Sequence, residues 1–132
     1  MKKINQELFI AILDDDPDFA YVLSRMIEKV LGAGKVQVHI QTFRTTQEAD
    51  TSPLSFDLLF LDVELPDVLG LNLLSEMRDE VLWDMKVVFY TSYDKYLLQA
   101  LRESAFDFLL KPFETEDLKV VIERYRKAVA SI

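Results

Sequence analysis

The stretch LLFLDV at residues 58–63 places four consecutive apolar side chains, Leu58 to Leu61, directly before an aspartate, Asp62. A strand that is apolar at successive positions is typical of a parallel sheet covered on both faces, because both of its rows of side chains are then buried. The run VVFY at 87–90 has the same character. We therefore expect these two segments to be strands at the centre of a parallel sheet.

Working outward from this stretch, three further apolar runs complete a pattern of strands alternating with helices. The five expected strands are Leu8–Leu13, Val36–Phe43, Leu58–Val63, Val87–Tyr90 and Phe106–Leu110. Apolar residues recur at helical spacing over 19–30, 97–105 and 118–129. This alternation predicts right-handed crossovers and an open, doubly wound α/β sheet, whose ligands bind beyond the carboxyl ends of the strands.

Length and composition indicate one domain over 1–132, with its core at about 7–130. The absence of cysteine excludes disulfides, thiolate metal sites and cysteine nucleophiles. No apolar run approaches the roughly 18 residues of a membrane helix, so we expect a cytoplasmic protein without membrane contact. The formal net charge of −8 argues against direct nucleic-acid binding, which depends on clustered lysine and arginine.

Side chains with chemical function follow four of the expected strands. An aspartate triplet, Asp14–Asp16, comes after the first strand, Asp62 ends the third, Thr91 follows the fourth and Lys111 follows the fifth. A doubly wound sheet brings these strand ends onto one edge, so the groups converge although they are far apart in sequence.

Crowded carboxylates repel one another, and a hard divalent cation with oxygen ligands, here expected to be Mg²⁺, holds them ionised. A carboxylate also acts as a nucleophile toward a phosphoryl donor when metal and cation neutralise the transferring charge. Asp62 is the candidate nucleophile, and Asp14 and Asp15 are the candidate metal ligands. Lys111 would pair with phosphoryl oxygens, and the Thr91 hydroxyl would donate a hydrogen bond to another.

These residues match a known family. Four segments carry the resemblance: ILDDDPD at 12–18, FLDVELPDVLG at 60–70, VVFYTS at 87–92 and FDFLLKPF at 106–113. Through them the sequence resembles, over essentially its whole length, the receiver domains of two-component response regulators. The ordered combination of these pieces is highly specific. The resemblance implies a flavodoxin-like fold, a five-stranded parallel sheet in the order 2-1-3-4-5 flanked by five helices.

The resemblance also implies roles for individual residues. Asp62 is then the phosphoacceptor and a metal ligand, Asp15 a direct Mg²⁺ ligand, Asp14 a ligand acting partly through water, and the Glu64 main-chain carbonyl a further ligand. The family commonly has a cis peptide at the position of Lys111–Pro112, and X-Pro bonds are where cis peptides occur.

In receivers, phosphorylation is coupled to rotation of the hydroxyl that corresponds to Thr91 and to inward movement of an aromatic residue, here Phe108. The partner implied is a cognate histidine kinase or phosphotransfer protein, and the output is an attached domain or a target protein. The surface that switches, and that commonly dimerises, comprises the fourth helix, fifth strand and fifth helix, here about 93–130. Such a domain is a signalling module with intrinsic autophosphorylation and autodephosphorylation chemistry on Asp62, not an enzyme.

The segment at 91–113 looks most like receivers that precede a LytTR-type DNA-binding domain, which would connect the chain to transcription regulation. Both a stand-alone receiver and the receiver of a longer regulator agree with the sequence. Two other classes of protein share some of these features. A haloacid-dehalogenase-like phosphohydrolase also uses an aspartate nucleophile with Mg²⁺, but it carries that nucleophile in an Asp-x-Asp motif on the first strand. A pseudo-receiver that docks partners without phosphorylation usually lacks one of the key residues.

Two residues near these motifs have simpler interpretations. Asp16 directly precedes Pro17 at an expected helix start, where an aspartate is at least as suited to capping the helix as to binding metal. His39 lies in a strand-like run without a partner motif, so we expect a structural or surface role for it.

Overall fold

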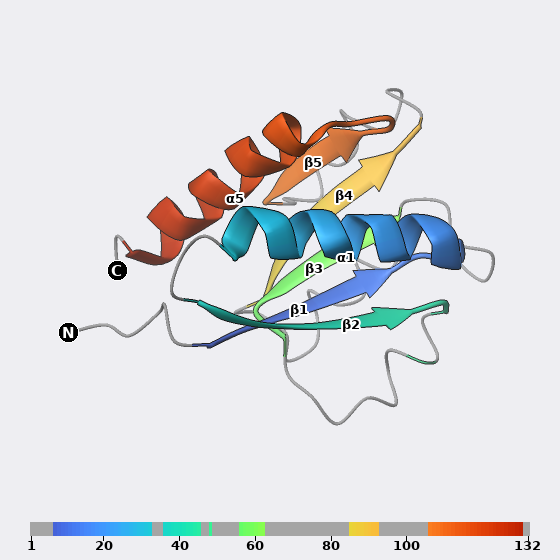
Figure 1. Cartoon of the computed structure of the whole chain (residues 1–132), viewed down its shortest axis with the longest axis horizontal. Coiled ribbons are helices and arrows are strands. Elements are labelled where there is room, and N and C mark those ends of the chain that lie inside the picture. Colours follow the sequence, from blue (N-terminus) through green and yellow to red (C-terminus); the bar gives the residue numbers. More distant parts are fainter. Residues whose placement is uncertain are drawn as a thin grey trace.

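The computed structural model describes residues 7–32, 36–45, 48, 56–62, 85–92 and 106–130. The described elements, in chain order, are β1 Glu7–Leu13, α1 Pro17–Leu31, β2 Gln37–Phe43, β3 Leu58–Asp62, β4 Lys86–Thr91, β5 Asp107–Leu110 and α5 Thr115–Ala130. The five strands form one sheet in the order β2-β1-β3-β4-β5, and every neighbouring pair is parallel (Figure 1). This is the strand order that the resemblance to receiver domains implied, and it confirms the predicted parallel sheet.

The expected elements agree closely with the observed ones. All five predicted strands are present, with limits that differ by a residue, and the helices predicted around 19–30 and 118–129 are α1 and α5. The helix predicted over 97–105 lies outside the described residues. Among the residues that are described, no helix is long and apolar enough to cross a membrane.

The centre of the sheet is its most buried part, as the apolar runs predict. Every residue of β3 is buried, and so is every residue of β4 after Lys86. The edge strand β2, in contrast, is buried only at Phe43. The central strands β3 and β4 are therefore shielded from solvent, and β2 forms a more exposed edge of the sheet.

Helices α1 and α5 lie side by side on one face of the sheet (Figure 1). Each contributes an apolar stripe at helical spacing, with Leu23 and Ile27 from α1 and Leu118 and Ile122 from α5 buried in one cluster. The side chains beneath them come from alternate positions of the strands, since successive side chains of a strand point to opposite faces. These strand residues are Leu8, Ile10, Ile12, Leu58, Phe60, Val88, Tyr90 and Leu109.

The start of α1 is fixed by a capping aspartate. The Asp16 carboxylate accepts hydrogen bonds from the backbone N–H groups of Asp18, at 3.0 Å, and Phe19, at 3.3 Å. Pro17 occupies the first turn, where its missing N–H costs no hydrogen bond. Asp16 is therefore the helix cap, as its position before Pro17 suggested, and its side chain turns to the helix.

Candidate functional site

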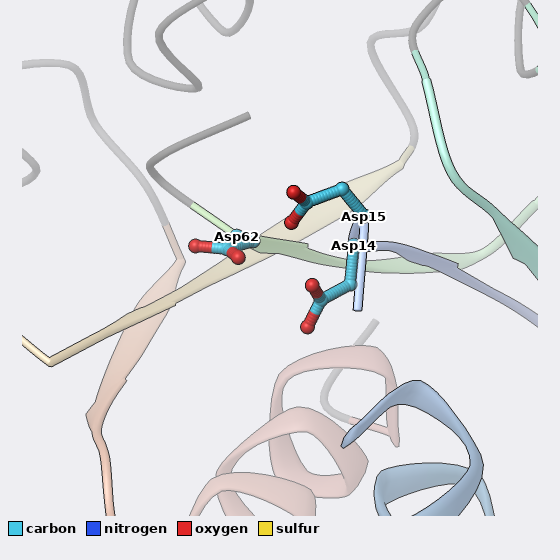
Figure 2. A group of neighbouring side chains, drawn as sticks. All are labelled: Asp14, Asp15 and Asp62. Carbon is cyan, nitrogen blue, oxygen red and sulfur yellow. The ribbon is translucent and has the colours of Figure 1, made fainter. Parts of the chain in front are cut away.

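Three aspartates converge at the carboxyl edge of the sheet. Asp14 and Asp15 directly follow β1, and Asp62 is the last residue of β3. One carboxylate oxygen from each lies within 4.8 Å of those of the other two. Figure 2 shows the carboxylate of Asp14 on the side of the sheet where the helices lie and that of Asp15 on the other side. The predicted acidic cluster is therefore formed.

The strand register explains this convergence. Leu13 of β1 is opposite Leu61 of β3, so the next residues along, Asp14 and Asp62, leave their strands at the same level. The Asp14 N–H donates to the carbonyl of Phe43 at 2.9 Å, which extends the β1–β2 ladder by one residue. Asp14 is held by the sheet although it lies beyond the strand.

The three carboxylates differ in their contact with solvent. Asp14 is 1% exposed and Asp62 is 7% exposed, whereas Asp15 is exposed. Because Asp15 opens to solvent, an ion in water reaches the cluster from that side.

Lys111 brings a cation to the same edge from β5. Its Nζ lies 3.9 Å from Oδ2 of Asp14 and 3.8 Å from Oδ2 of Asp62, and its side chain is 21% exposed. The backbone N–H of Lys111 donates to the carbonyl of Thr91 at 2.7 Å, which anchors the loop after β5 to the end of β4. The peptide bond between Lys111 and Pro112 is cis, as the family resemblance implied.

The remaining predicted site residues are placed as follows. Thr91 is the buried last residue of β4 and pairs with Leu110 in the sheet. Phe108 is half-buried in β5, opposite Phe89. Glu64, whose carbonyl was expected to bind metal, lies outside the described residues, as do Pro66 and Gly70 of the same motif. His39 stacks on Phe9 at the β1–β2 edge, with ring centroids 4.6 Å apart, which agrees with a structural role.

Tyr90 is a site residue that the sequence motifs did not single out. Its hydroxyl donates a hydrogen bond to Oδ2 of Asp14 at 2.8 Å, and both side chains are buried. Burial, together with the negative charge and hydrogen bond of Asp14 and the charges of Asp62 and Asp15, holds the pKa of Tyr90 well above its usual value. The hydroxyl therefore remains a donor at neutral pH. The sequence did contain one indication of this contact. A tyrosine stands in an otherwise apolar strand, and a buried tyrosine hydroxyl needs a hydrogen-bond partner.

Aromatic rings surround the ammonium group of Lys111. Its Nζ lies 4.3 Å from the ring centroid of Phe19 and 5.0 Å from that of Tyr90, within the range of cation–π attraction. Phe113 completes this cluster, with its ring centroid 5.8 Å from that of Phe19. Helix α1 thus contributes to the site through Phe19 by restricting where the lysine side chain lies.

The donor set fits a hard divalent cation. Three carboxylates converge and a single ammonium group lies within 4 Å of two of them, so negative groups outnumber positive ones among the described residues of the cluster. Carboxylate oxygens are the ligands that Mg²⁺ prefers, and Mg²⁺ binds through one or two carboxylates while keeping several waters. The open side at Asp15 leaves space for such waters.

Comparison with known proteins places this geometry in a family. The model of the response regulator receiver domain matches residues 10–123. An uncharacterized response regulatory protein of Vibrio cholerae is 36% identical over 115 residues, which are 86% of this chain and 47% of that protein. The sensory transduction protein LytT of Enterococcus faecalis is 33% identical over 126 residues, 91% of this chain and 48% of LytT. This chain thus spans about half the length of these two relatives.

A solved structure gives the same fold. The response regulator TrrA of Thermotoga maritima, in complex with Mg²⁺-BeF, matches with a TM-score of 0.75 and 24% sequence identity, covering 89% of this chain and 97% of TrrA. At that identity the likeness shows the fold alone. The family match over most of the sequence, the sheet order and the acidic cluster agree, and the chain belongs to the response regulator receiver domain family.

Proposed function

We propose that this receiver domain accepts a phosphoryl group on Asp62 in a Mg²⁺-dependent reaction, and that a histidine kinase or phosphotransfer protein is the donor. The observation that carries the proposal is the position of the Asp62 carboxylate. It lies within 4.8 Å of two further carboxylates and 3.8 Å from an ammonium group, at the ligand-binding edge of an α/β sheet.

Asp62 is better suited to the nucleophile's role than its two neighbours. The carboxylate of Asp14 accepts hydrogen bonds from Tyr90 and from the N–H of Asp16, which hold it in one orientation and suit it to the role of a metal ligand. Asp15 is exposed on the loop, further from the protected interior. Asp62 is nearly buried and faces Lys111, whose ammonium offsets the charge of an incoming phosphoryl group.

Transfer would form a bond between a carboxylate oxygen of Asp62 and phosphorus, while the bond from phosphorus to the donor's leaving group breaks. The leaving group keeps the electron pair of that bond, and Asp62 becomes an acyl phosphate. Lys111 would move from the carboxylates to the phosphoryl oxygens, and the Thr91 hydroxyl would donate a hydrogen bond to one of them.

Asp14, Asp15, Asp62 and the Glu64 carbonyl are the residues that would hold Mg²⁺. The metal ion would supply charge neutralisation for the phosphoryl oxygens. The complex of TrrA with Mg²⁺-BeF, in a protein of the same fold, supports this choice of ion.

We further propose that phosphorylation changes the surface formed by 93–130, through Thr91 and Phe108, and so controls an output domain, a target protein or a second copy of the chain. The similarity to the transcriptional regulatory protein BtsR of Salmonella typhi, 38% identical over 71 residues, favours transcription regulation as the output. The negative net charge of −8 indicates that DNA contact would come from another part of the regulator. We place the receiver itself in the cytoplasm, where such kinases present their phosphohistidine.

The test is labelling by acetyl phosphate followed by intact-mass measurement. The 132-residue chain should gain one phosphoryl group with Mg²⁺ and none with chelator. Asp62→Asn should gain none, because an amide nitrogen or oxygen is a poor nucleophile here, whereas the exposed control Glu123→Gln should label like the wild type. Lys111→Ala should fold normally and label slowly. Undiminished labelling of Asp62→Asn would refute the assignment, and an unlabelled wild type would favour a pseudo-receiver.

A further inference from the structure

The buried hydrogen bond between Tyr90 and Asp14 links the core of the sheet to the acidic cluster. It measures 2.8 Å from the hydroxyl to Oδ2 of Asp14, and the Asp14 side chain has no exposed surface. Tyr90 lies opposite Asp62 in the β3–β4 register. From this position its side chain extends past β3 and reaches the carboxylate of Asp14, which directly follows β1. The contact therefore joins the three central strands at the level of the site.

Three groups hold the Asp14 carboxylate, and each comes from a different part of the fold. Oδ1 accepts the N–H of Asp16 at 2.9 Å, and Oδ2 accepts the Tyr90 hydroxyl. Oδ2 also faces the ammonium of Lys111 at 3.9 Å. The lysine is shared with Asp62, where its Nζ is 3.8 Å away, so it is the member of the set that also faces the proposed phosphoacceptor.

We propose that Tyr90 is a positioning residue that keeps the Asp14 carboxylate oriented for Mg²⁺. This inference rests on the proposed function, in which Asp14 contributes to the metal site. When Lys111 turns to the phosphoryl group on Asp62, the hydroxyl of Tyr90 and the N–H of Asp16 are the described donors that stay on Asp14. A phenylalanine would fill the same space in the core, so the hydroxyl is the part of Tyr90 that serves the site.

Two effects of the hydroxyl on metal affinity oppose each other. The hydrogen bond draws some negative charge from Oδ2, which weakens its attraction for a cation. It also fixes the carboxylate in one orientation. A carboxylate oxygen has two acceptor positions, so one hydrogen bond leaves the other free for a metal-bound water. Removing a hydrogen-bond partner of a metal-binding carboxylate costs roughly 10–100-fold in affinity, so orientation dominates.

The first measurement is Mg²⁺ binding by calorimetry for the wild type, Tyr90→Phe and Tyr125→Phe. Tyr125 is the matched control, since it is another buried tyrosine of the same cluster but belongs to α5. Tyr90→Phe should bind Mg²⁺ about tenfold more weakly, and Tyr125→Phe should bind like the wild type. In acetyl phosphate labelling, Tyr90→Phe should need about tenfold more Mg²⁺ for half-maximal rate and should approach the wild-type rate at saturation.

A second comparison shows whether Tyr90 acts through Asp14. In an Asp14→Ala background, Tyr90→Phe should cause no further loss of Mg²⁺ affinity. In the wild type, the 13Cζ resonance of Tyr90 should shift as Mg²⁺ is added while that of Tyr125 stays, a readout that does not require the variant to fold. Unchanged or tighter Mg²⁺ binding by Tyr90→Phe, an equal loss without Asp14, or an unmoved Tyr90 resonance would each overturn the proposal.

The outcomes also separate this inference from the function on which it rests. If the wild type binds Mg²⁺ and labels on Asp62 but Tyr90→Phe matches it in both, only the role of Tyr90 is refuted. If the wild type neither binds Mg²⁺ nor labels, the proposed function and the role of Tyr90 are refuted together.

Discussion

The carboxylate of Asp62 is placed where its charge serves chemistry at the expense of stability. It faces the carboxylates of Asp14 and Asp15 within 4.8 Å and one ammonium, that of Lys111, at 3.8 Å. Among the charges that the structure describes around Asp62, the two carboxylates outweigh the one ammonium group when no metal is bound. A residue selected for stability alone would be neutral here.

Asp62→Asn should therefore raise the melting temperature in the presence of chelator. Relief of one net repulsion corresponds to about 1 kcal/mol after screening, or about 3 °C for a domain of this size. Thermal unfolding followed by circular dichroism measures the shift, and Glu123→Gln, which neutralises an exposed carboxylate of α5, should cause little change. A lower melting temperature for Asp62→Asn without metal would contradict this account of the cluster.

The positions of Asp14, Asp15, Asp62 and Lys111 could be predicted because each follows an apolar run, and parallel strands end at one edge. The role of Tyr90 could not be predicted in the same way. Its contact depends on the β3–β4 register and on which face of the sheet its side chain meets, and both are settled by tertiary packing. The polar tip of a tyrosine in a buried strand shows that a partner exists, but it does not identify the partner.

At the scale of elements, α1 begins next to the site. Of the three consecutive aspartates before it, Asp16 caps the helix, whereas Asp14 and Asp15 belong to the acidic cluster. The side chain of Asp16 is bonded to the first turn of the helix, whereas its backbone N–H is bonded to Asp14. A substitution of the side chain should thus affect the helix and spare the acidic cluster.

We expect Asp16→Ala to lower the free energy of unfolding by about 1 kcal/mol, because two N–H groups of the first turn lose their acceptor. Asp16→Asn should stay close to the wild type, since asparagine caps helices equally well. Urea denaturation of the three proteins measures the difference. An Asp16→Ala protein as stable as the wild type would show that the side chain does not act as a cap, and one that loses most of its Mg²⁺ affinity would show that the side chain also serves the acidic cluster.

The elements themselves were largely predictable because hydrophobic periodicity reports burial directly. The residues at which the strands begin and end were less predictable, and Thr91 is an example. Periodicity ended the strand at Tyr90, but Thr91 belongs to β4 because its carbonyl accepts the N–H of Lys111 and extends the ladder to β5. Backbone hydrogen bonds, which are not visible in the apolar pattern, decide where a strand ends.

At the scale of the whole molecule, the packing of both helices on the sheet buries two tyrosine side chains, Tyr90 and Tyr125. Burial, with a smaller contribution from the charge of Asp57, raises the pKa of Tyr125 to about 12. Burial and the neighbouring carboxylate of Asp14 also raise the pKa of Tyr90 well above its usual value. An unfolded tyrosine has a pKa near 10, so the folded state keeps protons that the unfolded state releases.

The stability that Tyr125 contributes is therefore fully present below pH 10 and is lost as the pH rises from 10 through about 12, where unfolding becomes increasingly favourable. For the wild type, the urea midpoint of unfolding should be lower at pH 11 than at pH 8. Tyr125→Phe should fall less over the same interval, because it has no proton to release at that position. An equal decline in both proteins would mean that Tyr125 does not couple to folding.

The central claim, that Asp62 is the acceptor, is tested most directly by locating the acyl phosphate in the chain. Borohydride reduces an aspartyl phosphate to homoserine, and tandem mass spectrometry of peptides then identifies the altered residue. After labelling with acetyl phosphate and Mg²⁺, we expect homoserine at position 62 and unchanged aspartate at 14 and 15. Homoserine at Asp14 or Asp15, or none in a chain that has gained a phosphoryl group, would contradict the account.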